Sequence, residues 1–339
     1  MNSNVSPILA VPTNIITGFL GVGKTSAILH LLKSKPADER WAVLVNEFGE
    51  IGVDGSLFEG THSKQQGVFI REVPGGCMCC AAGLPMQIAL SQLLSEARPD
   101  RLLIEPTGLG HPKEVLEVLT SEYYQEVLAL QKTLTLVDAR TLSDERYTNH
   151  ATFNQQIAMA DLIVGNKVDL YREGDTARLA NYVKEHAAPQ TEIVLTQNGD
   201  IPFSLLSGPS ANHLLNPHGH HHHHHHHKQD KPLASELPLP ESGFLKAENQ
   251  DEGYSSIGWR FAASKVFNYQ KLSTFLSTIR AVRMKAVFIT DTGVFGYNLT
   301  LDALNEMELD DALESRIEVI TDRQQDDLEP NLLACVLGE

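Results

Sequence analysis

The stretch GFLGVGKT near the N-terminus constrains this chain more than any other feature of its sequence. It occupies Gly18–Thr25, after the apolar run Ile8–Thr17 and before the amphipathic run Ser26–Lys33. A strand, a glycine-rich loop and a helix in this order match the pattern G-x-x-x-x-G-K-[ST], in which backbone N–H groups surround phosphates at a helix N-terminus. We therefore expect Lys24 to neutralise the β- and γ-phosphates and the Thr25 hydroxyl to bind Mg²⁺.

The nucleotide phosphates are expected to contact the whole loop and the start of the helix. The residues concerned are Gly18, Gly21, Val22, Gly23, Lys24, Thr25 and Ser26. A second segment, Leu102–Gly108 (LLIEPTG), is a strand that ends in an acid. Glu105 is placed to hold the Mg²⁺ shell, and the Gly108 N–H to sense the γ-phosphate. The alternative is that Glu105 is an ordinary solvated carboxylate at a strand end.

Short apolar runs alternate with helical patterns through the first two hundred residues. The predicted strands are Ala42–Val45, Leu102–Ile104, Thr133–Val137, Leu162–Val164 and Ile193–Leu195, and the predicted helices Pro85–Ala97, Pro112–Leu119 and Glu173–His186. Val-, Ile- and Leu-rich runs bounded by turn residues are typical of buried parallel strands. The pattern predicts a doubly wound α/β domain that binds ligands at the carboxyl ends of its strands.

The segment Asn166–Asp169 (NKVD) follows the predicted strand Leu162–Val164. An aspartate here can accept two parallel hydrogen bonds from guanine, while the stem of Lys167 packs across the base. We expect Asn166, Lys167 and Asp169 to select GTP. The alternative is an adenine nucleotide, with NKVD as an ordinary turn.

The pattern changes after residue 206. Residues 207–255 are rich in Pro, Gly, Ser, Asn, His and acids without periodicity, which predicts a disordered, His-rich linker. A smaller α+β domain is expected over residues 256–339, after the GTPase-like domain at 1–206. Its predicted strands are Ser256–Ala262, Ala286–Thr290, Val294–Asn298 and Arg316–Thr321, and its predicted helices Tyr269–Val282 and Leu328–Val336.

Three of the four cysteines lie in the tetrapeptide CMCC, as Cys77, Cys79 and Cys80. A tight cluster in a cytosolic chain indicates metal or redox chemistry rather than a disulfide framework. Zn²⁺ suits such thiolates best, with Co²⁺ or Cu⁺ as alternatives, and geometry requires one or two further ligands from elsewhere. A redox pair of Cys77 and Cys80, or buried inert cysteines, are the competing interpretations.

An acidic segment, Asn46–Asp54 (NEFGEIGVD), follows the second predicted strand, where a GTPase carries its first switch. Loop residues at such sheet edges often carry chemistry, so we expect a catalytic or metal-binding role for Glu47. Glu50 and Asp54 are as well explained by solvated charges as by metal binding.

A run of histidines lies within the predicted linker. It comprises His218, His220, His221, His222, His223, His224, His225, His226 and His227. Neutral imidazoles on a flexible segment offer overlapping, exchangeable sites for Zn²⁺, Ni²⁺, Co²⁺ or Cu²⁺. An engineered tag, or a low-complexity spacer without metal binding, are the alternatives. His30 is expected to be an ordinary packing or surface residue, and His111 is a weaker candidate for a second switch.

The net charge of −16 makes general affinity for nucleic acid or anionic membranes unexpected, since both require clustered Lys and Arg. The sequence lacks an apolar stretch of about 20 residues and an N-terminal signal pattern. We therefore expect a cytoplasmic protein, and cations as its natural partners.

Taken together, GFLGVGKT, VNEFGEIGVD, GGCMCC, EPTG and NKVD resemble the CobW-type metallochaperone GTPases, relatives of the nickel-insertion GTPases of hydrogenase and urease. The second domain is similar to the C-terminal domain of that family through Trp259, Ser264-Lys265, the strand pair Ala286–Asn298 and Ser315–Ile320. Val45 stands where some relatives carry a carboxylate, which weakens any claim to a secondary carboxylate site. Val266 replaces the family's glycine, a departure without a functional interpretation.

The resemblance implies a cytosolic GTPase that delivers a metal, often zinc and in some members cobalt, to a client protein. It implies phosphate and Mg²⁺ binding by the loop, base binding by NKVD, and metal binding by the three thiolates. Three hypotheses remain: a carrier gated by GTP, a metal store that uses the histidines, and a cobalt or nickel insertion factor for a cofactor enzyme. The client, the choice among zinc, cobalt and nickel, and the choice between monomer and homodimer stay open.

Overall fold

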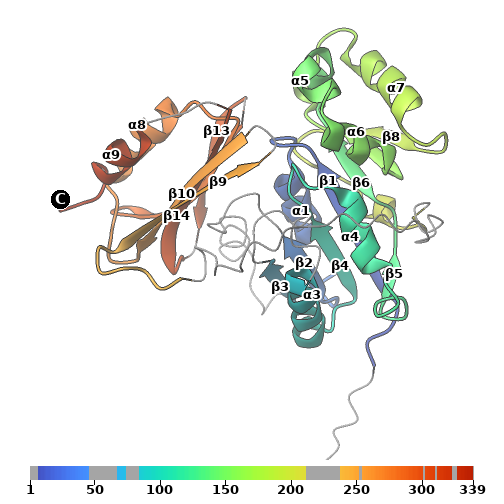
Figure 1. The fold of residues 1–339 in the computed structure, drawn as a ribbon, viewed down its shortest axis with the longest axis horizontal. Coiled ribbons are helices and arrows are strands. Elements are labelled where there is room, and N and C mark those ends of the chain that lie inside the picture. Colours follow the sequence, from blue (N-terminus) through green and yellow to red (C-terminus); the bar gives the residue numbers. More distant parts are fainter. Residues whose placement is uncertain are drawn as a thin grey trace, which may run out of the picture. The chain divides into compact units, whose positions relative to one another are not determined.

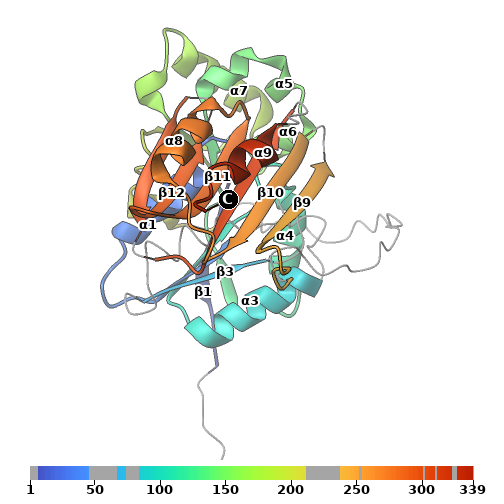
Figure 2. The same cartoon turned by 90° about the vertical axis from the view of Figure 1, so that its left-hand side faces the viewer.

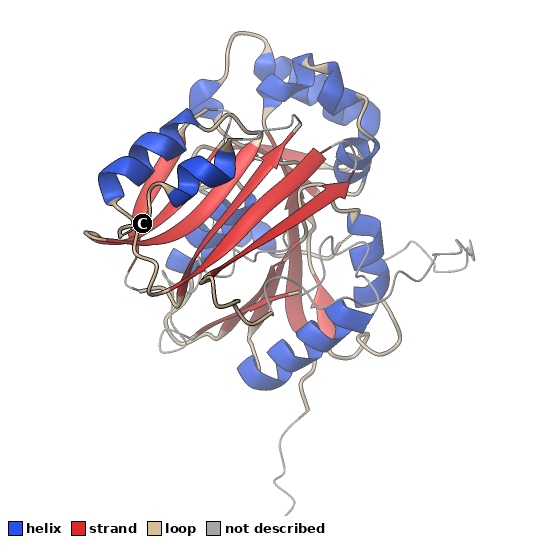
Figure 3. Ribbon diagram, turned by 60° about the vertical axis from the view of Figure 1, so that its left-hand side comes forward, coloured by secondary structure: helices blue, strands red, loops and turns tan. Residues whose placement is uncertain are grey.

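The computed structural model describes residues 7–45, 67–73, 84–210, 237–251, 254–300, 302–309, 311–322 and 327–338. These residues form two compact units, one before and one after residues 211–236. The first unit contains an eight-stranded sheet and the second a six-stranded sheet. Figure 3 shows the strands of both sheets in red and their helices in blue.

The sheet of the first unit is parallel throughout, in the order β3-β2-β4-β1-β6-β7-β8, with β5 beside β1. Its strands are β1 (Val11–Gly18), β2 (Trp41–Val45), β3 (Val68–Glu72), β4 (Arg101–Glu105), β5 (Leu128–Leu130), β6 (Leu134–Val137), β7 (Leu162–Gly165) and β8 (Glu192–Leu195). Every residue of β2 and β4 is buried, as expected for strands covered on both faces.

Helices connect these strands and cover the sheet. They are α1 (Lys24–Lys33), α3 (Leu84–Ala97), α4 (Pro112–Leu119), α5 (Glu145–Thr148), α6 (Ala151–Ala158) and α7 (Asp175–His186), with 3₁₀ turns η2 (Ala139–Ser143), η3 (Val168–Leu170) and η4 (Phe203–Leu206). Helix α1 connects β1 to β2, and α4 connects β4 to β5, so the two connections run in opposite directions across the sheet. Because such connections are right-handed, α1 and α4 lie on opposite faces of the sheet (Figure 1). Apolar side chains of α3 and α4 share one core with Ile15 and Ile104.

The sheet of the second unit is antiparallel, in the order β13-β12-β11-β14-β10-β9. Its strands are β9 (Phe244–Asp251), β10 (Tyr254–Ala262), β11 (Arg283–Thr290), β12 (Gly293–Leu299), β13 (Leu304–Leu309) and β14 (Glu314–Thr321). Helices α8 (Tyr269–Thr278) and α9 (Leu328–Leu333) lie side by side over this sheet (Figure 2). They bury a core around Trp259, Phe261 and Phe288.

The predicted fold class is confirmed, since a doubly wound parallel sheet and a separate α+β unit are both present. Two predicted helices, Tyr269–Val282 and Leu328–Val336, are too long, since α8 ends at Thr278 and α9 at Leu333. Helix α8 ends at Thr278 because Ile279 is extended and the Val282 N–H already donates to Ile320 O of β14. Hydroxyls of Ser277 and Thr278 also bond back to carbonyls of the last turn, which favours this end.

The predicted disordered linker, 207–255, is also too long. Strand β9 lies inside it and pairs antiparallel with β10 from Phe244 to Asp251. Strand β9 lies at the edge of the sheet, where it pairs with one neighbour only. Such a strand can carry polar side chains, which explains the polar composition of this segment. Residues 207–210 belong to the first unit, through Gln131 paired with Pro209. Residues 211–236 lie outside the described part of the chain.

Within the described segments, none of the helices combines the length and apolar character that crossing a bilayer requires.

Candidate nucleotide-binding site

The loop between β1 and α1 depends on its glycines. Gly18, Gly21 and Gly23 have φ angles of +141°, +72° and +98°. A Cβ on Gly18 would lie 2.5 Å from Leu136 O, and one on Gly23 would lie 2.6 Å from Asn166 Nδ2. The loop therefore packs directly against the ends of β6 and β7 in a conformation that other residues rarely adopt.

Lys24 begins α1 and is 5% exposed. Its ammonium group donates to Gly18 O at 2.8 Å and to Phe19 O at 3.2 Å. The side chain thus reaches back over the loop, which puts its charge beside the backbone where the loop begins. A cation here, together with the helix N-terminus, fits the terminal phosphates of a nucleotide.

Thr25 and Glu105 meet at the carboxyl end of the sheet. The Thr25 hydroxyl donates to Glu105 Oε1 at 3.0 Å, and the two residues are 9% and 3% exposed. The alternative that Glu105 is a solvated carboxylate is therefore wrong. A hydroxyl and a carboxylate oxygen at the phosphate loop are the hard oxygen ligands that Mg²⁺ takes, so these residues fit that ion.

The segment after Glu105 is held from two sides. A Cβ on Gly108 would lie 2.9 Å from the Leu20 backbone nitrogen, so Gly108 packs against the phosphate loop. On the other side, Gln156 Nε2 of α6 donates to Gly108 O at 3.0 Å and to Gly110 O at 3.3 Å. His111 Nδ1 pairs with Gln155 Oε1 at 2.9 Å. Sequence reasoning missed Gln155 and Gln156, because they lie more than 40 residues after Gly108 and His111 and no local pattern indicates the contact.

Asn166 has a structural role that the motif did not predict. Its side chain is 2% exposed, donates to Val22 O at 2.9 Å and accepts from the Gly199 N–H at 3.1 Å. It thereby ties the phosphate loop to the loops after β7 and β8. Asp169 is exposed in η3, where it is accessible to a base.

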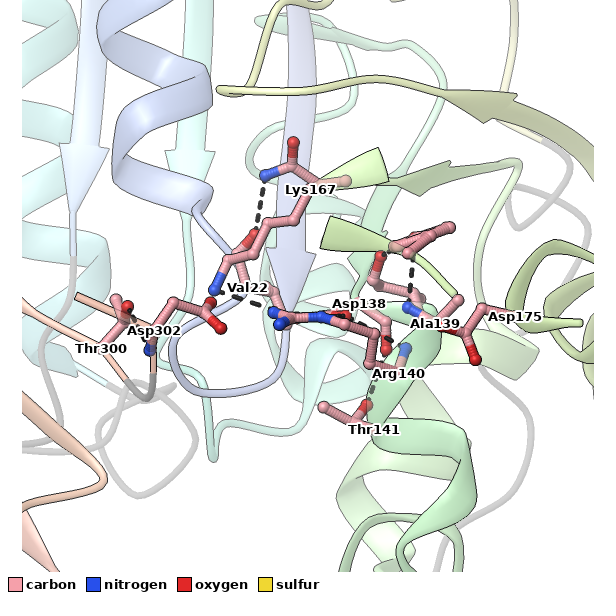
Figure 4. A network of polar contacts seen from close by, with 12 residues as sticks. Val22, Asp138, Ala139, Arg140, Thr141, Lys167, Asp175, Thr300 and Asp302 are labelled. Carbon is pink, nitrogen blue, oxygen red and sulfur yellow. Dashed lines mark hydrogen bonds and ion pairs between the residues drawn. The ribbon is translucent and has the colours of Figure 1, made fainter. Parts of the chain in front are cut away.

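Lys167 adopts the left-handed conformation, with a φ of +62°. Its ammonium group lies 3.9 Å from Asp138 Oδ2, a buried carboxylate at the end of β6 that also pairs with Arg140 (Figure 4). Asp138 is a further residue that sequence reasoning missed. Its signal was an acid directly after the predicted strand Thr133–Val137, in the same place as Glu105 after its own strand.

Most of the expected metal ligands lie outside the described residues. They are Glu47, Glu50, Asp54, Cys77, Cys79, Cys80, His218 and the histidines from His220 to His227. The described segments contain no group of three or more His, Cys, Asp or Glu side chains arranged to hold a metal. Cys335 is 3% exposed in the core of the second unit, and burial raises the pKa of its thiol.

Strands β2 and β3, which precede the segments with NEFGE and CMCC, nevertheless end at the same edge of the sheet as β4. Val45, the last residue of β2, is in register with Glu72 of β3 and with Glu105 of β4. The NEFGE segment begins directly after Val45, and the segment with CMCC begins after Val73. The described residues that precede both candidate segments therefore lie at the edge of the sheet where Thr25 meets Glu105.

The CobW/HypB/UreG nucleotide-binding domain matches residues 12–194, which include the phosphate loop, the Glu105 segment and NKVD. The chain belongs to the CobW/HypB/UreG family. Its first unit is accordingly a P-loop GTPase domain of this family, and the chain is a GTP-hydrolysing enzyme.

Full-length similarity extends beyond that domain. The chain is 40% identical to the zinc chaperone YeiR of Escherichia coli over 320 residues, which cover 93% of this chain and 94% of that protein. It is 27% identical to the zinc chaperone CobW of a Sinorhizobium species over 221 residues, or 58% of this chain and 62% of the relative. The solved structure of the Zn(II)-bound YjiA GTPase from E. coli aligns with a TM-score of 0.45 at 18% identity, over 96% of this chain and 99% of that one.

Proposed function

We propose that this CobW/HypB/UreG-family GTPase is a zinc carrier that binds the ion in its GTP state and releases it to a client protein after hydrolysis. Relatives named as zinc chaperones support the choice of metal. The single structural observation that carries the proposal is the register of Val45, Glu72 and Glu105. Because of it, the segments with NEFGE and CMCC start beside the residues that fit Mg²⁺.

The nucleotide is expected to bind across the carboxyl edge of the sheet. Lys24 and the loop N–H groups would hold the phosphates, and Asp169 the guanine base. Thr25 and Glu105 would hold Mg²⁺, whose charge would offset that of the terminal phosphates. Gly108, which packs against Leu20, would present its N–H to the γ-phosphate side of the site.

The metal site is expected at the thiolates of Cys77, Cys79 and Cys80. Thiolates bind Zn²⁺ strongly, and ordering of switch segments by the γ-phosphate is a common device of P-loop GTPases. Linkage requires that GTP tightens zinc binding by the same factor by which zinc tightens GTP binding. Hydrolysis would then weaken the site, and the client would receive the ion.

The histidine run supports a second candidate, a zinc store in which His218 and His220 to His227 do the binding. The two functions differ in stoichiometry. Replacing these histidines with asparagine in the full chain leaves one tight zinc per chain if the thiolates are the carrier site, and removes nearly all capacity if the protein is a store. Equilibrium dialysis with zinc measures this directly.

A matched variant tests the thiolates themselves. Cys77→Ser should abolish the tight zinc site, while Cys335→Ser, in the core of the second unit, should leave it unchanged. Zinc titration of both variants against a calibrated chelator, with GTP and Mg²⁺ present, decides the matter. Equal zinc affinity in both would refute a thiolate site at CMCC.

A further inference from the structure

The segment that follows β6, Asp138–Arg140, lies against the NKVD loop. The Asn166 N–H donates to Val137 O at 2.9 Å, which extends the parallel pairing of β7 with β6. Tyr171, at the far end of the loop, accepts a hydrogen bond from the Ala139 N–H at 3.1 Å. Burial raises the pKa of Tyr171 to about 12, so its hydroxyl stays protonated and donates to Val137 O at 3.4 Å. Both ends of the loop are thus fixed to this segment.

Asp138 is the acidic residue of this segment. Its side chain is 5% exposed, and it pairs with Arg140 through Nε–Oδ1 at 3.0 Å and NH2–Oδ2 at 2.6 Å. Lys167 Nζ lies 3.9 Å from the same Oδ2, and the Lys167 side chain is 18% exposed (Figure 4). A lysine has a long flexible stem, so an anion at its tip is needed to keep that stem extended in one direction.

We propose that Asp138 is a positioning residue for the guanine pocket, because it holds the ammonium of Lys167 so that the lysine stem forms one wall for the base. The inference rests on the proposed assignment of NKVD to the guanine base. Arg140 takes part by locking the Asp138 carboxylate in place: its own N–H also donates to Oδ1, at 3.1 Å. Asp138 itself touches Lys167 and Arg140, and acts on the nucleotide through Lys167.

The chain contains a matched control for this arrangement. Asp144 and Arg146 repeat the Asp-x-Arg spacing six residues later, where Asp144 caps α5. Arg146 donates from Nε to Asp144 Oδ1 at 3.1 Å and from NH2 to Oδ2 at 2.7 Å, as Arg140 does to Asp138. This second pair includes no residue of the nucleotide motifs. Loss of an Asp–Arg pair can therefore be separated from loss of the contact with Lys167.

The test measures binding of fluorescent GDP and GTP to the full chain and to four variants: Asp138→Asn, Lys167→Met, their double variant and Asp144→Asn. We expect Asp138→Asn to weaken both nucleotides equally, by about 5- to 20-fold and mainly through faster dissociation, since both carry the same base. Asp144→Asn should change affinity by less than about twofold. The double variant should bind no worse than Lys167→Met alone, because Asp138 acts through Lys167.

Three results would overturn the proposal. If Asp138→Asn binds like wild type, Asp138 does not position the pocket. If the losses of Asp138→Asn and Lys167→Met multiply, the two residues act independently. If Lys167→Met itself binds like wild type, the base does not lie at NKVD, and the proposed assignment of that site fails together with the inference. Melting temperatures of all four variants identify any loss that reflects unfolding.

Discussion

Asn166→Ala tests whether the motif asparagine ties the phosphate loop to its neighbours before any nucleotide binds. The substitution removes two buried hydrogen bonds, to Val22 O and from the Gly199 N–H. Each leaves a buried backbone group unsatisfied, and together they should cost about 2 to 4 kcal/mol of unfolding free energy. For a domain of this size, the melting temperature should fall by roughly 5 to 15 °C.

The two tryptophans make the measurement specific to the first unit. Trp41 is fully buried in β2 and Trp259 lies in the core of the second unit, so a Trp259→Phe background leaves Trp41 as the only tryptophan reporter. Thermal unfolding is followed by its fluorescence without nucleotide. The control is Asp169→Ala, an exposed residue whose loss should change stability by less than about 0.5 kcal/mol.

A melting temperature for Asn166→Ala within about 2 °C of the parent would refute this role of Asn166, because two unsatisfied buried groups should lower the free energy of unfolding by more than that. Asp169→Ala should show the converse behaviour. Its stability should be unchanged, and its preference for guanine over adenine nucleotides should be lost.

Three further outcomes are expected. Gln156→Leu removes the donors to Gly108 O and Gly110 O, and should lower GTP turnover at saturation by about 10-fold. The control Gln131→Leu, away from that segment, should leave turnover unchanged. Equal rates for Gln156→Leu and wild type in single-turnover assays would contradict this. Gly108→Ala should weaken GTP more than GDP in a binding titration, because its Cβ would press on Leu20; a uniform loss would argue against a γ-phosphate role. The Arg172 N–H and then the Arg178 guanidinium hold the pKa of Asp175 below its usual range. This carboxylate therefore stabilises the fold above about pH 4, and the stabilisation is lost as the pH falls further. The melting temperature of Asp175→Asn should depend less on pH than that of wild type over about pH 5 to 3.

Most of the parallel sheet could be predicted because six of its strands, all but β3 and β5, lie in short apolar runs, which carry their signal locally. Helix Pro112–Leu119 was predicted at its observed bounds, since proline begins it and an apolar stripe continues it. Four strands were missed: β3, β5, β9 and β13. In the parallel sheet, β3 (VFIRE) is an edge strand that ends in two charged residues, and β5 (LAL) has only three residues. The sequences of β9 and β13, FLKAENQD and LNEMEL, are polar on one face, and their partners β10 and β12 supply the ordering that composition does not reveal.

The nucleotide site divides in the same way. The phosphate loop, Glu105 and NKVD could be proposed as site residues from the sequence because a local pattern suffices to state their chemistry. Asp138 and Gln156 were not, because each matters only through a residue far along the chain, Lys167 in one case and Gly108 in the other. Asn166 was assigned to the base, whereas its buried contacts with Val22 and Gly199 depend on how three loops meet at the sheet edge.

The most direct test of the zinc carrier is the zinc affinity of the full chain with a non-hydrolysable GTP analogue and Mg²⁺, compared with GDP and Mg²⁺. Competition against a calibrated zinc chelator gives both values on the same protein. A GTP-gated carrier predicts one site that is tighter by about 10-fold or more with the GTP analogue, and a GTP analogue that binds tighter by the same factor when zinc is present. Equal zinc affinities in the two nucleotide states would contradict the coupling on which the proposed function depends.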